Sequence, residues 1–330
     1  MHSVWRVWGA ALLLLGSALS AGAQAQEFPN RPVALVIPYP TGGPVDLVGR
    51  MLSERLTARL GQPVVVENRG GAGGTIGTQR VAKAPADGHV LLLTAQTPVT
   101  IAPLFKPAPP YDARTELLPI ARVVSTPVLV LGPGDGPDKD LAALVARAKG
   151  SGMDLNYGAP GIGNEMHLIW ETLRMSAGIK STAIPYQGTG PGLIDLTAGR
   201  IDVMVTAPAS VRNLLADGKL RALAVVSDRR LEELPDVPTV GESGVQLPTI
   251  PIPWLGLFAP GGTPAAVAER IYQAVLAVSE EPSYRERMRK FGMDPAVKGL
   301  GEFTAEVDLY SKEWSRVVSE GGIDGSQIGR

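Results

Sequence analysis

The sequence predicts an α/β protein of two domains. The chain has 330 residues, of which 45% are hydrophobic and 19% charged, as is typical of a globular protein with a sizeable core. At roughly 100–200 residues per domain, this length favours two domains. Short apolar runs alternate with amphipathic segments of helical length, and this order is typical of sheets covered by helices. The 39 glycines and 29 prolines lie between these segments and indicate many tight turns.

Residues 1–25 have the pattern of an export signal. Arg6 precedes an apolar run over 7–19, and Ala23-Gln24-Ala25 forms a small-x-small cleavage site. We therefore expect a secretory signal peptide that is cleaved near Ala25, with an uncleaved N-terminal anchor as the alternative. No later run in the sequence approaches ~18 apolar residues, so we expect no stable membrane insertion. Export of a chain without cysteine favours the bacterial periplasm.

The first α/β unit begins directly after this segment. Strands are predicted at 33–37, 64–67 and 90–94, and helices at about 44–60 and 75–84. Gly61 ends the first helix, because glycine readily adopts the left-handed conformation that closes helices. The β-α-β-α-β order predicts a parallel sheet with helices on both faces.

A similar unit recurs further along the chain. Its strands are predicted at 127–131, 155–158, 183–186, 203–205 and 223–226, and its helices at 141–148, 164–176 and 192–198. A proline-rich stretch over 235–253 leads to one more apolar run at 254–260. Residues 264–319 are predicted to be helical, with breaks at Pro282 and over 292–301.

Two strand-to-helix loops share a design that suits an anion. Gly42-Gly43 follows the strand at 33–37, and a loop with glycines at 158, 161 and 163 follows the strand at 155–158. Glycine allows close approach of the backbone, and the helix N-terminus beyond offers free N–H groups and partial positive charge. Each loop alone is also consistent with an ordinary tight turn. One such loop in each domain favours a two-sided carboxylate cradle.

The sequence offers few residues for metal, thiol, nucleotide or nucleic-acid binding. The absence of cysteine excludes disulfides and thiolate sites, and the net charge of −1 argues against a nucleic-acid binder. His167 and Glu171 have the spacing of a metal pair, but without a third ligand we expect packing there. Ile76 breaks the dinucleotide fingerprint in the glycine-rich stretch 71–77. Asp46, in a first helical turn, fits a capping role, with fixing of the glycine loop or binding of a ligand ammonium as alternatives.

Taken together, these segments resemble the solute-binding family of tripartite tricarboxylate transporters, also called Bug proteins. The resemblance runs over essentially the whole mature chain, and the order and spacing of its segments make it specific. It is carried by residues 39–46, 61–69, 71–77, 87–88, 157–168, 185–188, 218–224, 234–239 and 254–260.

The resemblance implies an α/β periplasmic binding protein of the type II-like, Venus flytrap kind, with two lobes and a hinge. Lobe one would comprise 27–124 and 252–330, and lobe two 125–251, with crossings near Ser125-Thr126 and Pro251–Trp254. A small carboxylic acid would be bound in the interlobe cleft through backbone N–H groups and ordered water, without metal or cofactor. The residues expected to bind it are Tyr39, Thr41, Gly42, Gly43, Asp46, Thr94, Gln96, Ala159, Gly161, Gly163, Asn164 and Thr206.

Several positions depart from the family pattern. Thr41 stands where alanine is common, Ala159 and Asn164 replace hydroxyl residues, and His89 replaces a tyrosine. Thr206-Ala207 occupies a stretch that often carries an acidic residue. Polar groups lost or gained in a cleft change which ligand is satisfied, so the sequence leaves open which carboxylate or aromatic acid is bound.

We therefore expect a monomeric, non-catalytic periplasmic receptor that hands a small carboxylate to inner-membrane permease subunits. In the first alternative, the closed receptor docks on a sensor kinase and reports the ligand. In the second, the chain is a periplasmic hydrolase on the same fold, against which stand the missing cysteine and the absence of a nucleophile–base motif. The third is a scavenger without a dedicated transporter. The sequence does not give the ligand's affinity.

Overall fold

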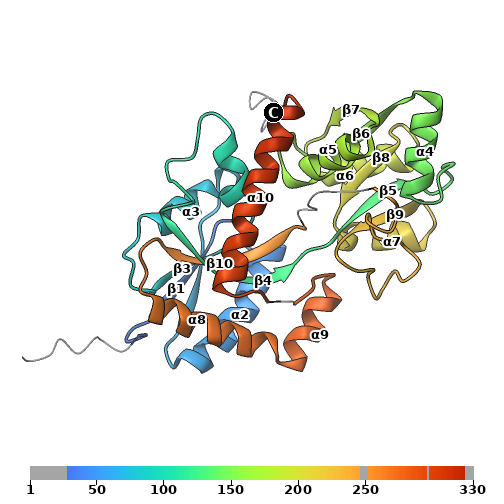
Figure 1. Ribbon diagram of the computed structural model, residues 1–330. Coiled ribbons are helices and arrows are strands. Elements are labelled where there is room, and N and C mark those ends of the chain that lie inside the picture. Colours follow the sequence, from blue (N-terminus) through green and yellow to red (C-terminus); the bar gives the residue numbers. More distant parts are fainter. Residues whose placement is uncertain (1–27, 246–251, 296, 324–330) are drawn as a thin grey trace, which may run out of the picture.

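The computed structural model describes residues 28–245, 252–295 and 297–323, which form two five-stranded sheets with helices packed around them (Figure 1). The predicted signal peptide lies outside these residues, and so does Pro251 at the second predicted crossing. Within the described ranges, no helix has the length and apolarity needed to cross a bilayer. The predicted α/β class is confirmed.

The first sheet has the order β2-β1-β3-β10-β4. Strand β1 pairs in parallel with β2 and β3, as predicted, but β10 lies antiparallel between β3 and β4. The parallel pairing predicted for the strands of the first α/β unit is confirmed, and the antiparallel β10 joins this sheet only after the chain has passed through the second sheet. The strands are β1 (Val33–Ile37), β2 (Val64–Asn68), β3 (Val90–Ala95), β4 (Leu117–Ser125) and β10 (Trp254–Pro260).

The second sheet repeats this arrangement with the order β7-β6-β8-β5-β9. Strand β6 pairs in parallel with β7 and β8, whereas β5 is antiparallel to β8 and β9. The chain passes from the first sheet to the second between β4 and β5. The strands are β5 (Val128–Pro133), β6 (Asp154–Ala159), β7 (Lys180–Pro185), β8 (Val203–Thr206) and β9 (Leu220–Val226).

The helices begin and end largely where local signals place them. Helix α2 starts with Pro44 at its first position and ends at Gly61, whose φ is 74°. Helix α4 is capped by Asp140, which accepts a 2.8 Å hydrogen bond from Ala143 N. The helices are α2 (Pro44–Leu60), α3 (Thr75–Ala82), α4 (Leu141–Ser151), α5 (Glu165–Ala177), α6 (Thr189–Thr197), α7 (Arg212–Ala216), α8 (Ala265–Ser279), α9 (Pro282–Lys290) and α10 (Leu300–Glu320); a short π-helical segment follows β3 (Thr97–Ile101).

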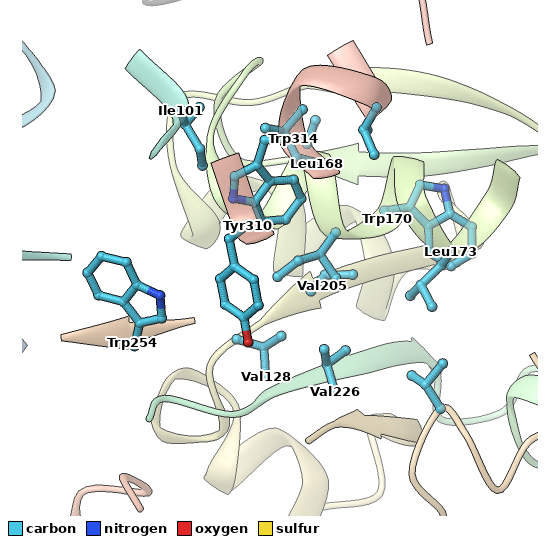
Figure 2. Close-up of a cluster of buried hydrophobic side chains, with 14 of the residues drawn as sticks. Ile101, Val128, Leu168, Trp170, Leu173, Val205, Val226, Trp254, Tyr310 and Trp314 are labelled. Atoms are coloured by element: carbon cyan, nitrogen blue, oxygen red, sulfur yellow. The ribbon is translucent and has the colours of Figure 1, made fainter. Parts of the chain in front are cut away.

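Helix α10 links the two sheets. It packs against β4 of the first sheet and against α5, which belongs to the second. Figure 2 shows Tyr310 and Trp314 of α10 among buried side chains that include Leu168 of α5 and Val128 of β5. The Tyr310 hydroxyl also accepts a 3.2 Å hydrogen bond from Ile252 N, just before β10. A continuous apolar cluster therefore joins the C-terminal helix to both sheets beside the strand ends.

Candidate functional site

The two glycine loops lie at the carboxyl ends of strands in different sheets. The first, residues 38–43, joins β1 to α2, and the second, residues 160–164, joins β6 to α5. Gln96 follows β3, Glu165 opens α5, and Gln96 Nε2 donates a 3.0 Å hydrogen bond to Glu165 Oε2. Segments at the strand ends of the two sheets are therefore in direct contact. Such edges are where open α/β sheets bind their ligands.

Asp46 organises the first loop. Its Oδ2 accepts 2.9 Å hydrogen bonds from Gly42 N and Arg50 Nε, and its Oδ1 accepts one of 2.9 Å from Asn68 Nδ2. These bonds, chiefly the one from Arg50, lower the pKa of Asp46 to about 2. The carboxylate is buried and hydrogen-bonded within the protein on both oxygens. Of the roles that the sequence left open, this geometry supports fixing of the glycine loop.

The two glycines of the first loop differ in whether their backbone conformation requires glycine. Gly42 has a φ of 86°, in the left-handed region that favours glycine. Gly43 has an ordinary extended conformation, with a φ of −78° and a ψ of 170°. A Cβ on Gly43 would meet no atom closer than Pro40 O at 3.8 Å. The fold therefore does not require glycine at position 43. The space that a side chain on residue 43 would enter is open, and Thr41 nearby in the chain is exposed.

The second loop repeats the construction of the first. Gly163 has a φ of 77°, and its N–H donates a 3.0 Å hydrogen bond to His167 Nδ1. Burial lowers the pKa of His167, which favours the neutral imidazole that can accept this bond. In each loop, a left-handed glycine thus donates its N–H to a side chain four residues later. Both of these glycine N–H groups are used internally, and Asn164 takes the N–H of His167. The first-turn N–H groups left for a ligand are those of Val45 and Asp46 in α2 and of Glu165 and Met166 in α5.

Asn164 holds the second loop against its helix. Its Oδ1 accepts a 2.9 Å hydrogen bond from His167 N, and its Nδ2 donates one of 2.8 Å to Pro160 O. Gly161 has a φ of 118°, and a Cβ there would lie 3.1 Å from Asn164 Nδ2. Ala159 is buried at the end of β6. An asparagine in place of a hydroxyl residue therefore caps α5 and also fixes the preceding turn.

Tyr39 and Thr94 meet at the strand ends of the first sheet. Their hydroxyl oxygens are 3.4 Å apart, and burial raises the pKa of Tyr39 to about 12, so its hydroxyl stays protonated. A Cβ on Gly74 would lie 3.2 Å from the Tyr39 hydroxyl, so the glycine-rich turn beside it makes room for this ring. In the second sheet, Thr206 is buried at the end of β8.

Sequence reasoning missed Glu165. Acidic residues are common in the first turn of a helix because they complement its dipole, so the sequence carries no distinctive signal at this position. The structure places its carboxylate against the buried Gln96 of the other sheet. Burial raises the pKa of Glu165, although the hydrogen bond from Gln96 acts in the opposite direction. The negative charge of Glu165 also contributes to the raised pKa of Tyr39.

The N-termini of α2 and α5, together with the two glycine loops, offer hydrogen-bonding groups to a ligand. The described ranges contain no cluster of three His, Cys, Asp or Glu side chains suited to a metal ion. A cavity of about 220 Å³ lies elsewhere, beside the ion pair of Arg229 with Asp294, and its lining includes no residue of the two glycine loops. Ligand contact by the predicted site residues stays a prediction.

The chain is similar in sequence to one receptor family along most of its length. The model of the tripartite tricarboxylate transporter family receptor, TctC, matches residues 48–323. A Pseudomonas sp. (strain P51) protein, described as the UPF0065 protein in the tcbD-tcbE intergenic region, is 33% identical, covering 98% of this chain and 96% of that one. BugT of Bordetella pertussis is 31% identical, covering 94% and 95% respectively.

Solved structures match the whole architecture. A TctC solute-binding protein from Polaromonas, without ligand, has a TM-score of 0.79 and 28% identity, covering 89% of this chain and 99% of that one. An R. palustris protein with adipate has a TM-score of 0.73, 30% identity and coverage of 90% and 99%. MatC from Rhodopseudomonas palustris with bound malate has a TM-score of 0.66, 31% identity and coverage of 88% and 100%. The predicted binding-protein fold with two α/β domains is confirmed.

Proposed function

Because the chain belongs to the receptor family of tripartite tricarboxylate transporters, we propose that it is a periplasmic receptor for a small carboxylate. It captures the ligand between its two lobes and delivers it to inner-membrane permease subunits, without catalysing a reaction. Relatives of similar structure hold malate and adipate, which supports small carboxylates as the ligand class. Export through a signal peptide cleaved near Ala25 belongs to the same proposal.

The observation that carries this proposal is the pair of matched glycine loops. Each ends at a helix N-terminus, and in each a side chain four residues on fixes the backbone of a left-handed glycine. First-turn N–H groups and the positive end of the helix dipole favour a carboxylate. Loops held in this way lose little conformational freedom on binding, so less of the interaction energy is spent on ordering them.

Closure about a hinge would bring these loops onto the ligand. We place residues 27–124 and 252–330 in one lobe and residues 125–251 in the other. The crossings near Ser125-Thr126 and Pro251–Trp254 would then form the hinge. The hydrogen bond from Gln96 to Glu165 would run between the lobes, next to the loops that close. A ligand that contacts both lobes shifts the population toward the closed form.

Purified mature protein tests the proposal directly. A thermal-shift screen of small mono-, di- and tricarboxylates, amino acids and pyridine carboxylates should find a stabilising ligand, since ligand at 100 times its Kd adds about 2.7 kcal/mol. Small-angle scattering should show a smaller radius with ligand, and chromatography should return the ligand unchanged. Steady turnover without added partners would favour a hydrolase. Stabilisation by none of these acids would contradict the receptor assignment.

A further inference from the structure

Within the described part of the chain, Gln96 Oε1 and Glu165 Oε1 receive no hydrogen bond, although the two side chains are in contact. Gln96 is fully buried, and its Oε1 has no hydrogen-bond partner in the described part of the chain. Its Nε2 is bound to Glu165 Oε2, so the whole amide faces the N-terminus of α5. Buried polar atoms in native proteins are almost always hydrogen-bonded. An unpaired buried acceptor at a candidate site is therefore a place where a ligand or a water molecule could donate a hydrogen bond.

Glu165 lacks a compensating charge. Across the described ranges, no lysine or arginine forms an ion pair with it, and Gln96 supplies its hydrogen bond. By contrast, Asp46, the acid in the first turn of α2, is paired with Arg50 at 2.9 Å. A carboxylate that is largely removed from water is costly unless it is paired. Burial therefore raises the pKa of Glu165, and a cationic group placed beside it would stabilise its ionised form.

A plain dicarboxylate fits this arrangement poorly. One of its carboxylates would suit the N-terminus of α2, but a second one near α5 would meet the carboxyl group of Glu165, which carries no positive charge in either protonation state. Both Gln96 Oε1 and Glu165 Oε1 accept hydrogen bonds, and neither can donate to an anion while Glu165 is ionised. An ammonium group has three N–H donors and a positive charge, and therefore satisfies both acceptors at once.

We infer that Gln96 and Glu165 form a subsite for an ammonium group, so that the preferred ligand is a small amino acid rather than a plain di- or tricarboxylate. This inference rests on the proposed receptor function. The ligand carboxylate lies at the first glycine loop, and its ammonium lies between the amide of Gln96 and the carboxylate of Glu165.

Matched pairs of acids test the subsite. Calorimetric titration at pH 7.5 compares L-aspartate with succinate and L-glutamate with glutarate, since each pair differs only in the amino group. We expect the better-binding amino acid to bind at least 10-fold more tightly than its partner. Glu165→Gln keeps the shape of the side chain and removes its charge, and it should weaken amino-acid binding at least 10-fold while bringing the two affinities of the pair together.

A control variant separates the subsite from a general effect of charge. Glu302 occupies the first turn of α10 and is exposed, so Glu302→Gln removes an acid of similar helical position and should leave the preference unchanged. Circular dichroism and a cooperative thermal transition show that the variants fold.

Several outcomes would overturn the inference. Succinate or glutarate binding as tightly as its amino partner would do so, and so would an unaltered preference in Glu165→Gln. The latter would mean that Glu165 is protonated and donates to the amide. In these cases the receptor function stands, because a carboxylate is still bound. If a wider panel of amino acids and of their deamino counterparts gives no binding, the proposed function fails together with the inference.

Discussion

Replacing Asp46 by alanine removes the acceptor that holds the first glycine loop. Three hydrogen bonds of 2.9 Å converge on this carboxylate, from Gly42 N, Arg50 Nε and Asn68 Nδ2. Each hydrogen bond to a charged group is worth about 1.5–3 kcal/mol, but water can take over part of the lost contacts at the exposed Gly42. We expect Asp46→Ala to lower the free energy of unfolding by about 2–3 kcal/mol. At about 2–4 °C per kcal/mol, Tm should fall by roughly 4–12 °C.

The same interaction predicts how stability depends on pH. The pKa of Asp46 in the folded chain is lowered from 3.8 to about 2, mainly by the hydrogen bond from Arg50. A lowered folded-state pKa adds stability above about pH 4, and this contribution is lost as the pH falls toward about 2. The Arg50 side chain is 55% exposed, and allowing for solvent screening, the contribution is roughly 1–2 kcal/mol. The gap between the wild type and Asp46→Ala should therefore narrow over this interval.

Urea denaturation followed by circular dichroism at pH 7, 4 and 2.5 measures both effects. Arg50→Ala is the matched control, because it removes one half-exposed donor and leaves the other two bonds intact. It should cost about 1 kcal/mol or less at pH 7. Equal stability of Asp46→Ala and wild type at pH 7 would refute the reasoning. So would a stability difference that stays constant from pH 7 to pH 2.5.

Three further predictions concern the glycine loops and the N-terminus. Gly43→Val should keep the wild-type Tm, because a Cβ there lies 3.8 Å from the nearest atom. It should nevertheless weaken ligand binding at least 10-fold in calorimetry. Unchanged affinity would argue against close approach of a ligand to residue 43. Gly163→Ala should lower the free energy of unfolding by about 1–2 kcal/mol in urea, because its φ is 77°, and a neutral effect would contradict the strain. Intact-mass measurement of protein from periplasmic extract should place the N-terminus near Gln26, whereas full-length chain in membranes would contradict cleavage.

The elements that the sequence predicted best are those with local start and stop signals. Helix α2 begins at Pro44 and ends before the left-handed Gly61, as its pattern indicates. Strand β4 was missed, because Pro119 interrupts its apolar run. It exists through pairing with β10, more than a hundred residues later, and proline is tolerated there because β4 is an edge strand of its sheet.

The loops of the candidate site were predicted from the sequence, but the hydrogen bonds that their N–H groups make within the protein were not. The spacing of Gly163 and His167 is visible in the sequence, yet a glycine loop gives no sign that its N–H is taken by an imidazole. The contact made by Glu165 was not predicted for a different reason. Its partner, Gln96, lies 69 residues earlier and in the other sheet, so only the packing of the two sheets brings them together.

The two helix ends that face the site therefore differ in how their acidic side chains are paired, although their loops share one construction. At α2, the charge of Asp46 is neutralised by Arg50, so the positive end of the helix dipole remains available to an anion. At α5, His167 is favoured in its neutral form, and Glu165 has no cationic partner among the described residues, so its ionised form lacks the compensation that Arg50 gives Asp46. A ligand with a carboxylate at one end and an ammonium at the other matches this polarity in one orientation only. Two similar loops can therefore select both the class of the ligand and its direction in the cleft.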